Sequence, residues 1–159
     1  MAIKSSGYIF IEILIAIALI SMVFVVLLGL SFQSVNLSSS IQKKTQADAY
    51  VREELEELRS FRDGTTWTSN GLGTVTVGQN YYLTFNSGTN KYQLNSGTET
   101  VSGFTRSLVF NQVQRDGSGT IVSSGGTVDT NTMKATATIT GNSIAQQQVV
   151  VYLTNWQNK

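Results

Sequence analysis

Apolar and polar residues are distributed unevenly along the chain, and the most apolar stretch lies near the start. Ile9 to Leu30 is a run of 22 residues in which Glu12 is the single charged member. A helix of this length rises about 33 Å, at about 1.5 Å per residue, which is enough to cross the hydrocarbon core of a bilayer. The pattern predicts a membrane-spanning helix over residues 8–30.

After Leu30 the pattern changes, but nothing interrupts the helix. Neither proline nor glycine occurs from Ser31 to Asp63, and apolar residues recur every three to four positions, as on one buried helix face. Asp63-Gly64 then supplies a stop, with glycine as the C-terminal cap. We predict an amphipathic continuation of the helix over residues 31–63, whose buried face is formed by Ala47, Val51, Leu55, Leu58 and Phe61 or Arg62.

From Gly64 onward, Gly, Ser, Thr and Asn become dense and apolar residues begin to alternate with polar ones. This pattern predicts an antiparallel β-rich head over residues 64–159. One face of its sheet is expected to cover the second half of the helix, which gives an α+β fold. The expected strands are Thr74–Val77, Tyr81–Phe85, Lys91–Leu94, Phe104–Val113, Gly119–Ser123, Met133–Thr140 and Gln146–Asn155.

The composition argues against an enzyme. The chain contains no His and no Cys, so it lacks the commonest general base, the commonest metal ligand and any disulfide. No Gly-rich phosphate loop or G-x-S-x-G elbow is present. The formal net charge of +1 argues against a general electrostatic grip on nucleic acid. We therefore predict no catalytic residues, no cofactor and no metal site.

Two acidic stretches resemble ligand sites, and both have a simpler interpretation. Consecutive residues on a helix point in different directions, so neighbouring glutamates cannot converge on one ion. We predict a solvated helix face, paired with Arg52 and Arg59, for Glu53, Glu54, Glu56 and Glu57. Asp116-Gly-Ser-Gly is predicted to be a turn, because calcium takes about 6–8 oxygen ligands and few carboxylates lie nearby.

The residues before the apolar run suggest processing. A short polar leader with Lys4 ends at Gly7, whereas a secretory signal peptide carries its small-residue cleavage site after the apolar region. Cleavage between Gly7 and Tyr8 would keep the helix on the mature protein and make Glu12 its fifth residue. An acidic side chain near the bilayer centre costs about 2.5–3.5 kcal/mol, so Glu12 needs a partner or must snorkel to the headgroups.

This order of features resembles the N-terminus of the type IV pilin and pseudopilin superfamily. That signature is a basic leader ending in glycine, an aromatic residue, and then apolar residues with glutamate at the fifth mature position. Gly7, Tyr8 and Glu12 match it, and Tyr8 stands where phenylalanine is commonest. Many major pilins also carry a proline late in the membrane segment. The corresponding place here holds Gly29, which weakens a helix by about 1 kcal/mol and so predicts a local softening.

The resemblance implies a structural filament subunit. Residues 1–7 would be a leader that a prepilin peptidase removes after Gly7, and the same enzyme would methylate the new amino group of Tyr8. Glu12 would then align subunits by pairing with that amino group on a neighbouring helix. The implied partners are copies of itself, other pilins, the prepilin peptidase and an assembly platform in the membrane. The implied location is the cytoplasmic (inner) membrane, as a single-pass protein, before assembly, and an extracellular or periplasmic filament afterwards.

A second interpretation remains open. The same features also fit a permanent single-pass membrane protein that displays a β-rich binding or adhesion head. Gly7 and Glu12 discriminate between the two, because a plain membrane anchor has no use for either residue.

Overall fold

One long helix precedes a seven-stranded sheet in the computed structural model, which describes residues 6–141 and 144–157. Helix α1 covers Ser6–Gly64, 59 residues, and ends at the predicted glycine. Contacts within the chain group into two units that divide between Gln42 and Lys43. The first unit holds the apolar part of α1, and the second holds the rest of α1 together with the sheet.

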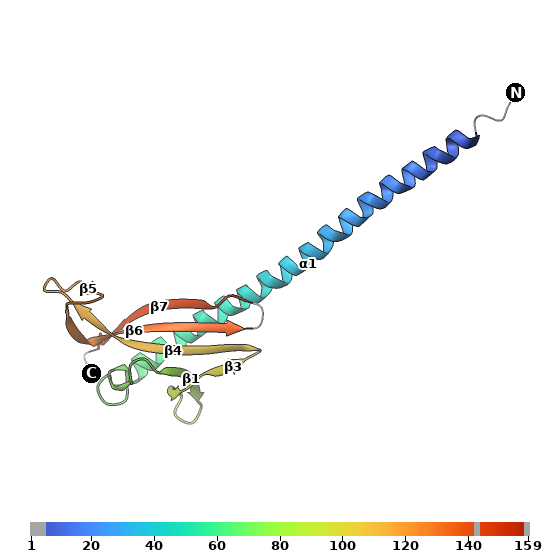
Figure 1. Cartoon of the computed structure of the whole chain (residues 1–159). Coiled ribbons are helices and arrows are strands. Elements are labelled where there is room, and N and C mark those ends of the chain that lie inside the picture. The colour runs from blue at the N-terminus through green and yellow to red at the C-terminus, as the bar shows by residue number, and fades with distance from the viewer. Residues whose placement is uncertain (1–5, 142–143, 158–159) are drawn as a thin grey trace. The chain divides into compact units, whose positions relative to one another are not determined.

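All strand pairs in the second unit are antiparallel, and the sheet has the order β2-β1-β4-β6-β7 (Figure 1). The short strands β3 and β5 pair with β4 outside this path. A 3-10 helix, η1 (Leu72–Thr74), precedes the first strand. The strands are β1 (Asn80–Asn86), β2 (Lys91–Ser96), β3 (Glu99–Val101), β4 (Phe104–Arg115), β5 (Ile121–Val122), β6 (Thr127–Gly141) and β7 (Gln147–Thr154).

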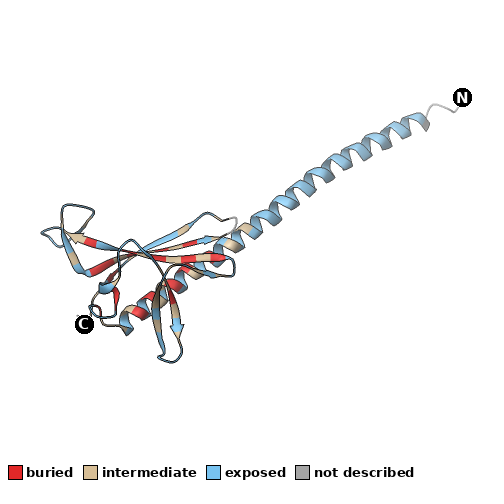
Figure 2. Ribbon diagram, turned by 60° about the horizontal axis from the view of Figure 1, so that its bottom comes forward, coloured by how far each residue is buried: buried red, intermediate tan, exposed pale blue. Residues whose placement is uncertain are grey.

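The core of the second unit lies between α1 and one face of the sheet, which confirms the predicted α+β fold. Buried positions lie on the last turns of α1 and alternate along the central strands (Figure 2). From α1 these are Ala47, Val51, Leu58 and Phe61, with Leu55 partly buried. Fully burying one large apolar side chain contributes about 1.5–3 kcal/mol, so this interface stabilises both elements.

The pairing of β4 with β6 places large side chains beside small ones. Leu108 lies opposite Ala137, and Phe110 lies opposite Ala135, and all four are buried. The alanines leave room for the neighbouring leucine and phenylalanine, so α1 packs closely on this part of the sheet. The alternation of apolar and polar residues predicted for Met133–Thr140 is present, with Ala135, Ala137 and Ile139 buried.

The predicted strands differ from the observed ones in three places. Thr74–Val77 is not a strand: η1 occupies its start, because the Gly73 amide donates a hydrogen bond to the Trp67 carbonyl (2.9 Å) and turns the chain. Strand β3 was not predicted, since it has only three residues. Strand β6 begins at Thr127 rather than Met133, and a register shift beside Gln112 and Val113 accommodates the irregular pairing there.

Candidate functional site

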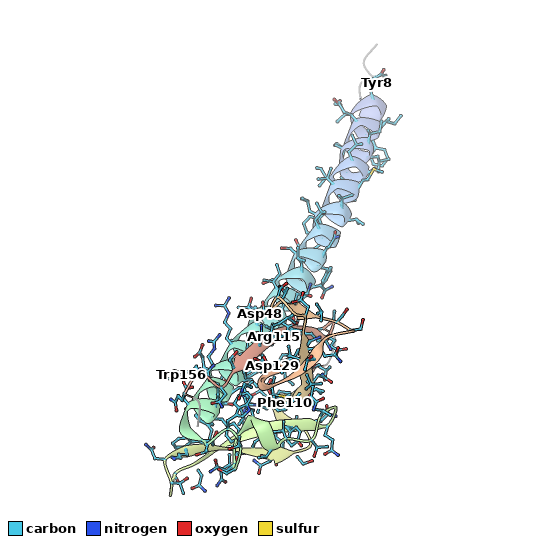
Figure 3. The ribbon with its side chains drawn as sticks, turned by 90° about the vertical axis from the view of Figure 1, so that its left-hand side faces the viewer. Tyr8, Asp48, Phe110, Arg115, Asp129 and Trp156 are labelled. Atoms are coloured by element: carbon cyan, nitrogen blue, oxygen red, sulfur yellow. The ribbon has the colours of Figure 1, made fainter. Side chains whose placement is uncertain are left out.

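The exposed apolar surface of the first unit is the most unusual feature of the chain. Every large apolar side chain of α1 from Tyr8 to Leu30 is 46–81% exposed. Figure 3 draws these side chains around the whole circumference of the helix, with Tyr8 near its beginning. Among the residues that the structure describes, α1 is the one helix long and apolar enough to cross a membrane. A continuous apolar surface of this size requires lipid or other protein to cover it.

Glu12 lies within this apolar surface, less than two turns from the start of α1. Its side chain is exposed in the isolated chain, and no hydrogen bond or ion pair joins it to another described residue. Its neighbours one turn away are Tyr8 and Ala16, neither of which carries a charged side chain. Any environment that covers this part of α1 therefore also buries a carboxylate that no residue in the described part of the chain neutralises.

Neither helical glycine of the first unit is required by packing. A Cβ atom added to Gly7 or Gly29 would meet nothing within 4 Å. Both residues lie inside α1, which remains helical at Gly29. Alanine would favour the helix by about 1 kcal/mol at the interior position of Gly29, and packing gives no reason for glycine at either position.

The second unit contains a buried acidic cluster, and this corrects the prediction of a fully solvated glutamate face. Glu54 is 0% exposed, and neither of its carboxylate oxygens has a hydrogen-bond partner. Glu57 is partly buried on the same side of α1, whereas Glu53 and Glu56 are exposed. Glu53 and Glu56 are exposed as predicted, and Glu56 forms an ion pair with Arg59. The prediction was wrong for Glu54 because the helix period places it between Val51 and Leu58 on the buried face.

Arg106 of β4 is the cation nearest to this cluster. Its Nε donates a hydrogen bond to Oε2 of Glu99 on β3 (2.6 Å), and its Nη1 lies 3.6 Å from Oε2 of Glu57. The second distance allows charge attraction but not a hydrogen bond. Glu99 and Glu57 therefore share one guanidinium, whose charge also acts on Glu54 without a hydrogen bond, and the Arg106 side chain is only 8% exposed. We name Glu54, Glu57, Glu99 and Arg106 the acidic cluster.

Burial shifts the titration of two members of the acidic cluster, Glu54 and Glu57. Burial raises the pKa of Glu54 to about 8, although the charge of Arg106 opposes this shift. Burial also raises the pKa of Glu57, again against Arg106. Burial acts to lower the pKa of Arg106, but the hydrogen bond to Glu99 and the surrounding carboxylates outweigh it and raise that pKa. The cluster thus contains Arg106, which stays charged, and Glu54, whose neutral form is favoured near neutral pH.

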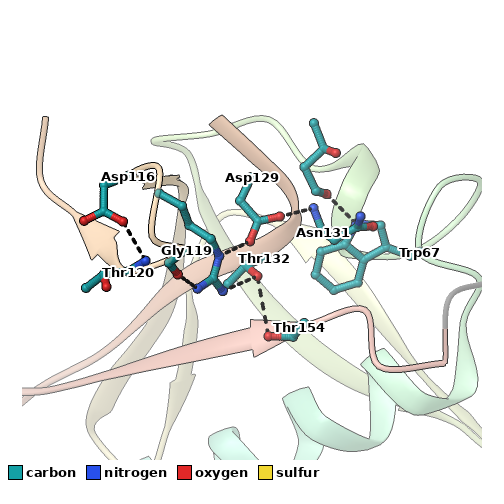
Figure 4. A network of polar contacts seen from close by, with 10 residues as sticks. Trp67, Asp116, Gly119, Thr120, Asp129, Asn131, Thr132 and Thr154 are labelled. Atoms are coloured by element: carbon teal, nitrogen blue, oxygen red, sulfur yellow. Dashed lines mark hydrogen bonds and ion pairs between the residues drawn. The ribbon is translucent and has the colours of Figure 1, made fainter. Parts of the chain in front are cut away.

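A second polar network lies where the end of β4 pairs with the start of β6 (Figure 4). Arg115 Nε donates a hydrogen bond to Asp129 Oδ2 (2.7 Å), and its Nη1 donates to the Gly119 carbonyl (2.7 Å). The Asp116 carboxylate accepts hydrogen bonds from the backbone amides of Ser118 and Thr120, each at 2.9 Å. Asp116 therefore closes a tight turn, as predicted. Within residues 6–141 and 144–157, no three or more acidic side chains are arranged so that they could hold a metal ion.

Replacing Asp129 with asparagine is expected to cost about 1 kcal/mol of unfolding free energy at pH 7, because it removes a charge-assisted hydrogen bond that is partly open to solvent. The hydrogen bond from Arg115 lowers the pKa of Asp129 below its usual 3.8. The stabilisation is therefore present above about pH 3.8 and is lost as the pH falls through the lower, folded-state value. Denaturant unfolding of both proteins at about pH 7 and pH 2.5 checks this, and an equal deficit at the two pH values would contradict it.

A pocket of about 560 Å³ opens between the end of α1 and the β1–β2 hairpin. Its one charged lining residue among those described is Lys91, whose ammonium donates a hydrogen bond to the Gly64 carbonyl (3.0 Å). The Tyr81 hydroxyl, also in the lining, accepts a hydrogen bond from the Thr76 amide (3.0 Å). These two polar groups already form hydrogen bonds with the backbone, and the described lining residues present no arrangement of side chains suited to catalysis.

No protein-family model, curated protein or solved structure matches the chain. Its features therefore have to be interpreted from its own residues. The structure places Gly7, Tyr8 and Glu12 within the first two turns of α1, and it places Gly29 near the end of the apolar run. The acidic cluster, which sequence analysis did not identify, is far along the chain from these residues. The signal that could have revealed it is the position of Glu54 on the apolar face of its helix.

Proposed function

We propose that the chain is a structural subunit of a type IV pilus-like filament, cut by a prepilin peptidase after Gly7 and assembled through the apolar part of α1. The observation that carries this proposal is the combination of an apolar helix exposed on all sides with a single carboxylate near its start. In this interpretation the helix is held in the cytoplasmic membrane before assembly. It then packs against the helices of other subunits in an extracellular or periplasmic filament.

Gly7 supports processing at this site. A glycine in a helix weakens that helix, and the surroundings of Gly7 would accept a larger residue. A protease, in contrast, benefits from a missing side chain because it can approach the backbone closely. Recognition by a peptidase therefore explains a residue that the fold does not need.

Glu12 supports assembly. Cleavage after Gly7 creates an α-amino group on Tyr8, which is cationic at neutral pH in water. Where neighbouring helices exclude lipid and water, that ammonium group neutralises the Glu12 carboxylate of an adjacent subunit. Such a buried pair costs desolvation energy, so its main contribution is to set the axial register between subunits rather than to add stability.

Intact mass spectrometry tests the proposal. We expect the full chain, expressed with a prepilin peptidase, to lose Met1–Gly7 and to gain a methyl group on Tyr8. Without the peptidase the full mass should remain. Gly7→Glu should abolish the cleavage, because its side chain blocks access to the backbone. Gly29→Ala, a change at the other helical glycine of the first unit, is the matched control and should be processed normally.

One result would overturn the proposal. If the wild-type mass stays unprocessed while the peptidase cuts a control substrate in the same cells, the chain is not part of a pilin system. It would then be better described as a permanent single-pass membrane protein that displays a β-rich binding or adhesion head. In that case Gly7→Glu and Glu12→Ala should leave its membrane insertion unchanged.

A further inference from the structure

Glu54 is a buried carboxyl group without a compensating partner. It lies in the interface between α1 and the sheet, is 0% exposed, and has both oxygens excluded from water. An ionised carboxylate in such a place loses its hydration without gaining hydrogen bonds, which costs several kcal/mol. A neutral carboxylic acid in the same place costs much less.

The groups around Glu54 do not compensate its charge. From β4, Arg106 donates a hydrogen bond to Glu99 and lies near Glu57, and it makes no hydrogen bond with Glu54. From α1, Glu57 adds negative charge, and β3 adds Glu99; the exposed Glu53 acts on Glu57 instead. Strands β6 and β7 present apolar side chains and one glutamine to the same face, which are Met133, Ala135, Ala137, Ile139, Gln147, Val149, Val151 and Leu153.

We propose that Glu54 is a proton-binding site that makes the packing of α1 on the sheet depend on pH. The protonated side chain is compatible with the closed interface. Removing the proton places a third negative charge beside Arg106, and the chain then relieves it by loosening α1 from the sheet or by admitting water. This inference concerns the second unit alone and does not rest on the proposed function.

The direction of the pH dependence follows from the titration of Glu54. Burial raises its pKa from 4.5 to about 8 in the folded chain. Because the folded state binds the proton more tightly than the unfolded state, the stabilisation is complete below about pH 4.5. It is lost progressively as the pH rises and is gone above about pH 8. Acid therefore tightens this interface and mild alkali opens it.

Equilibrium unfolding of the full chain in detergent micelles tests the proposal, with the fluorescence of Trp67, which is buried in the core, as the signal. Between pH 5 and pH 9 the unfolding equilibrium constant of the wild type should rise by about 100- to 1000-fold. Glu54→Gln keeps the shape of the side chain and cannot ionise, so most of this rise should disappear. The variant should also be the more stable protein at pH 8.5.

Glu53→Gln is the matched control, because it removes the same charge from the neighbouring, exposed position. It should keep the wild-type pH dependence. Hydrogen exchange provides a second readout: at pH 8.5 the amides of residues 47–61 should exchange faster in the wild type than in Glu54→Gln. Wild type and Glu54→Gln with equal pH dependence, or with equal exchange, would overturn the proposal.

An infrared measurement keeps the proposal testable if Glu54→Gln does not fold. A protonated carboxylic acid has its own carbonyl band, and we expect the folded wild type to retain one at pH 7, where exposed carboxyl groups are ionised. Glu54→Met, which fills a similar volume without a charge, should lack that band. A wild-type spectrum without the band at pH 7 would contradict a proton on Glu54.

Discussion

Replacing Phe110 with alanine is expected to lower the unfolding free energy of the second unit by about 3–5 kcal/mol, which is the usual cost of removing a fully buried aromatic ring. Phe110 lies on β4, is 0% exposed, and packs its ring 5.7 Å from that of Tyr81. Its partner across the strand pair is Ala135, which is too small to fill the space. Folded domains have unfolding free energies of about 5–15 kcal/mol, so this one change removes a large share.

Denaturant unfolding of the full chain in detergent, at one pH, measures the effect of Phe110→Ala. Val109→Ala is the control, because Val109 is the preceding residue on β4 and points to the opposite, partly exposed face. Val109→Ala should lower the unfolding free energy by about 1 kcal/mol or less. Similar losses for the two variants would mean that α1 and the sheet do not form the core described here.

Glu12→Ala is expected to remove subunits from filaments almost completely when wild-type protein is present in the same cells. In the proposed filament this change deletes one partner of a buried charge pair and leaves the α-ammonium of a neighbouring Tyr8 buried alone, which typically costs about 3–5 kcal/mol. A cost of this size corresponds to a factor of at least about 100 in an equilibrium. We therefore expect the ratio of variant to wild type to fall at least about tenfold between the membrane and the filament.

Mass spectrometry of the two fractions gives both ratios, and the N-terminal peptide shows whether Glu12→Ala is still cut after Gly7. Glu53→Ala is the control, because it removes an equivalent charge from the exposed surface of the second unit. It should enter filaments normally. Normal entry of correctly cut Glu12→Ala would show that Glu12 does not align subunits.

The longest elements of the fold could be predicted because one local pattern decides each of them. No proline or glycine interrupts residues 31–63, so α1 continues to Gly64. Apolar and polar residues alternate from Met133 to Thr140, which predicts a strand, and the structure places that stretch inside β6. The apolar spacing of Val51, Leu58 and Phe61 also identified the helix face that meets the sheet.

The errors arose where distant residues decide the local structure. Thr74–Val77 has the composition of a strand, but the chain turns beside it, where Gly73 packs against Trp67, and Trp67 is held by a hydrogen bond from its Nε1 to the distant Thr130 carbonyl. The four glutamates Glu53, Glu54, Glu56 and Glu57 were predicted to form one solvated face, although the helix period places Glu54 between Val51 and Leu58 on the apolar side. The grouping of Glu54 with Glu99 and Arg106 depends on the approach of β3 and β4, which no short stretch of sequence contains.

The order of elements along the chain also determines when the core can form. Leu58 and its neighbours on α1 are made early, whereas β6, which pairs with both β4 and β7, ends only at Gly141. Contacts between residues so far apart slow folding, because a long loop must close before they form. During synthesis the apolar stripe of α1 therefore stays uncovered until β6 has left the ribosome. The newly made chain is most exposed to chaperones and proteases in that interval.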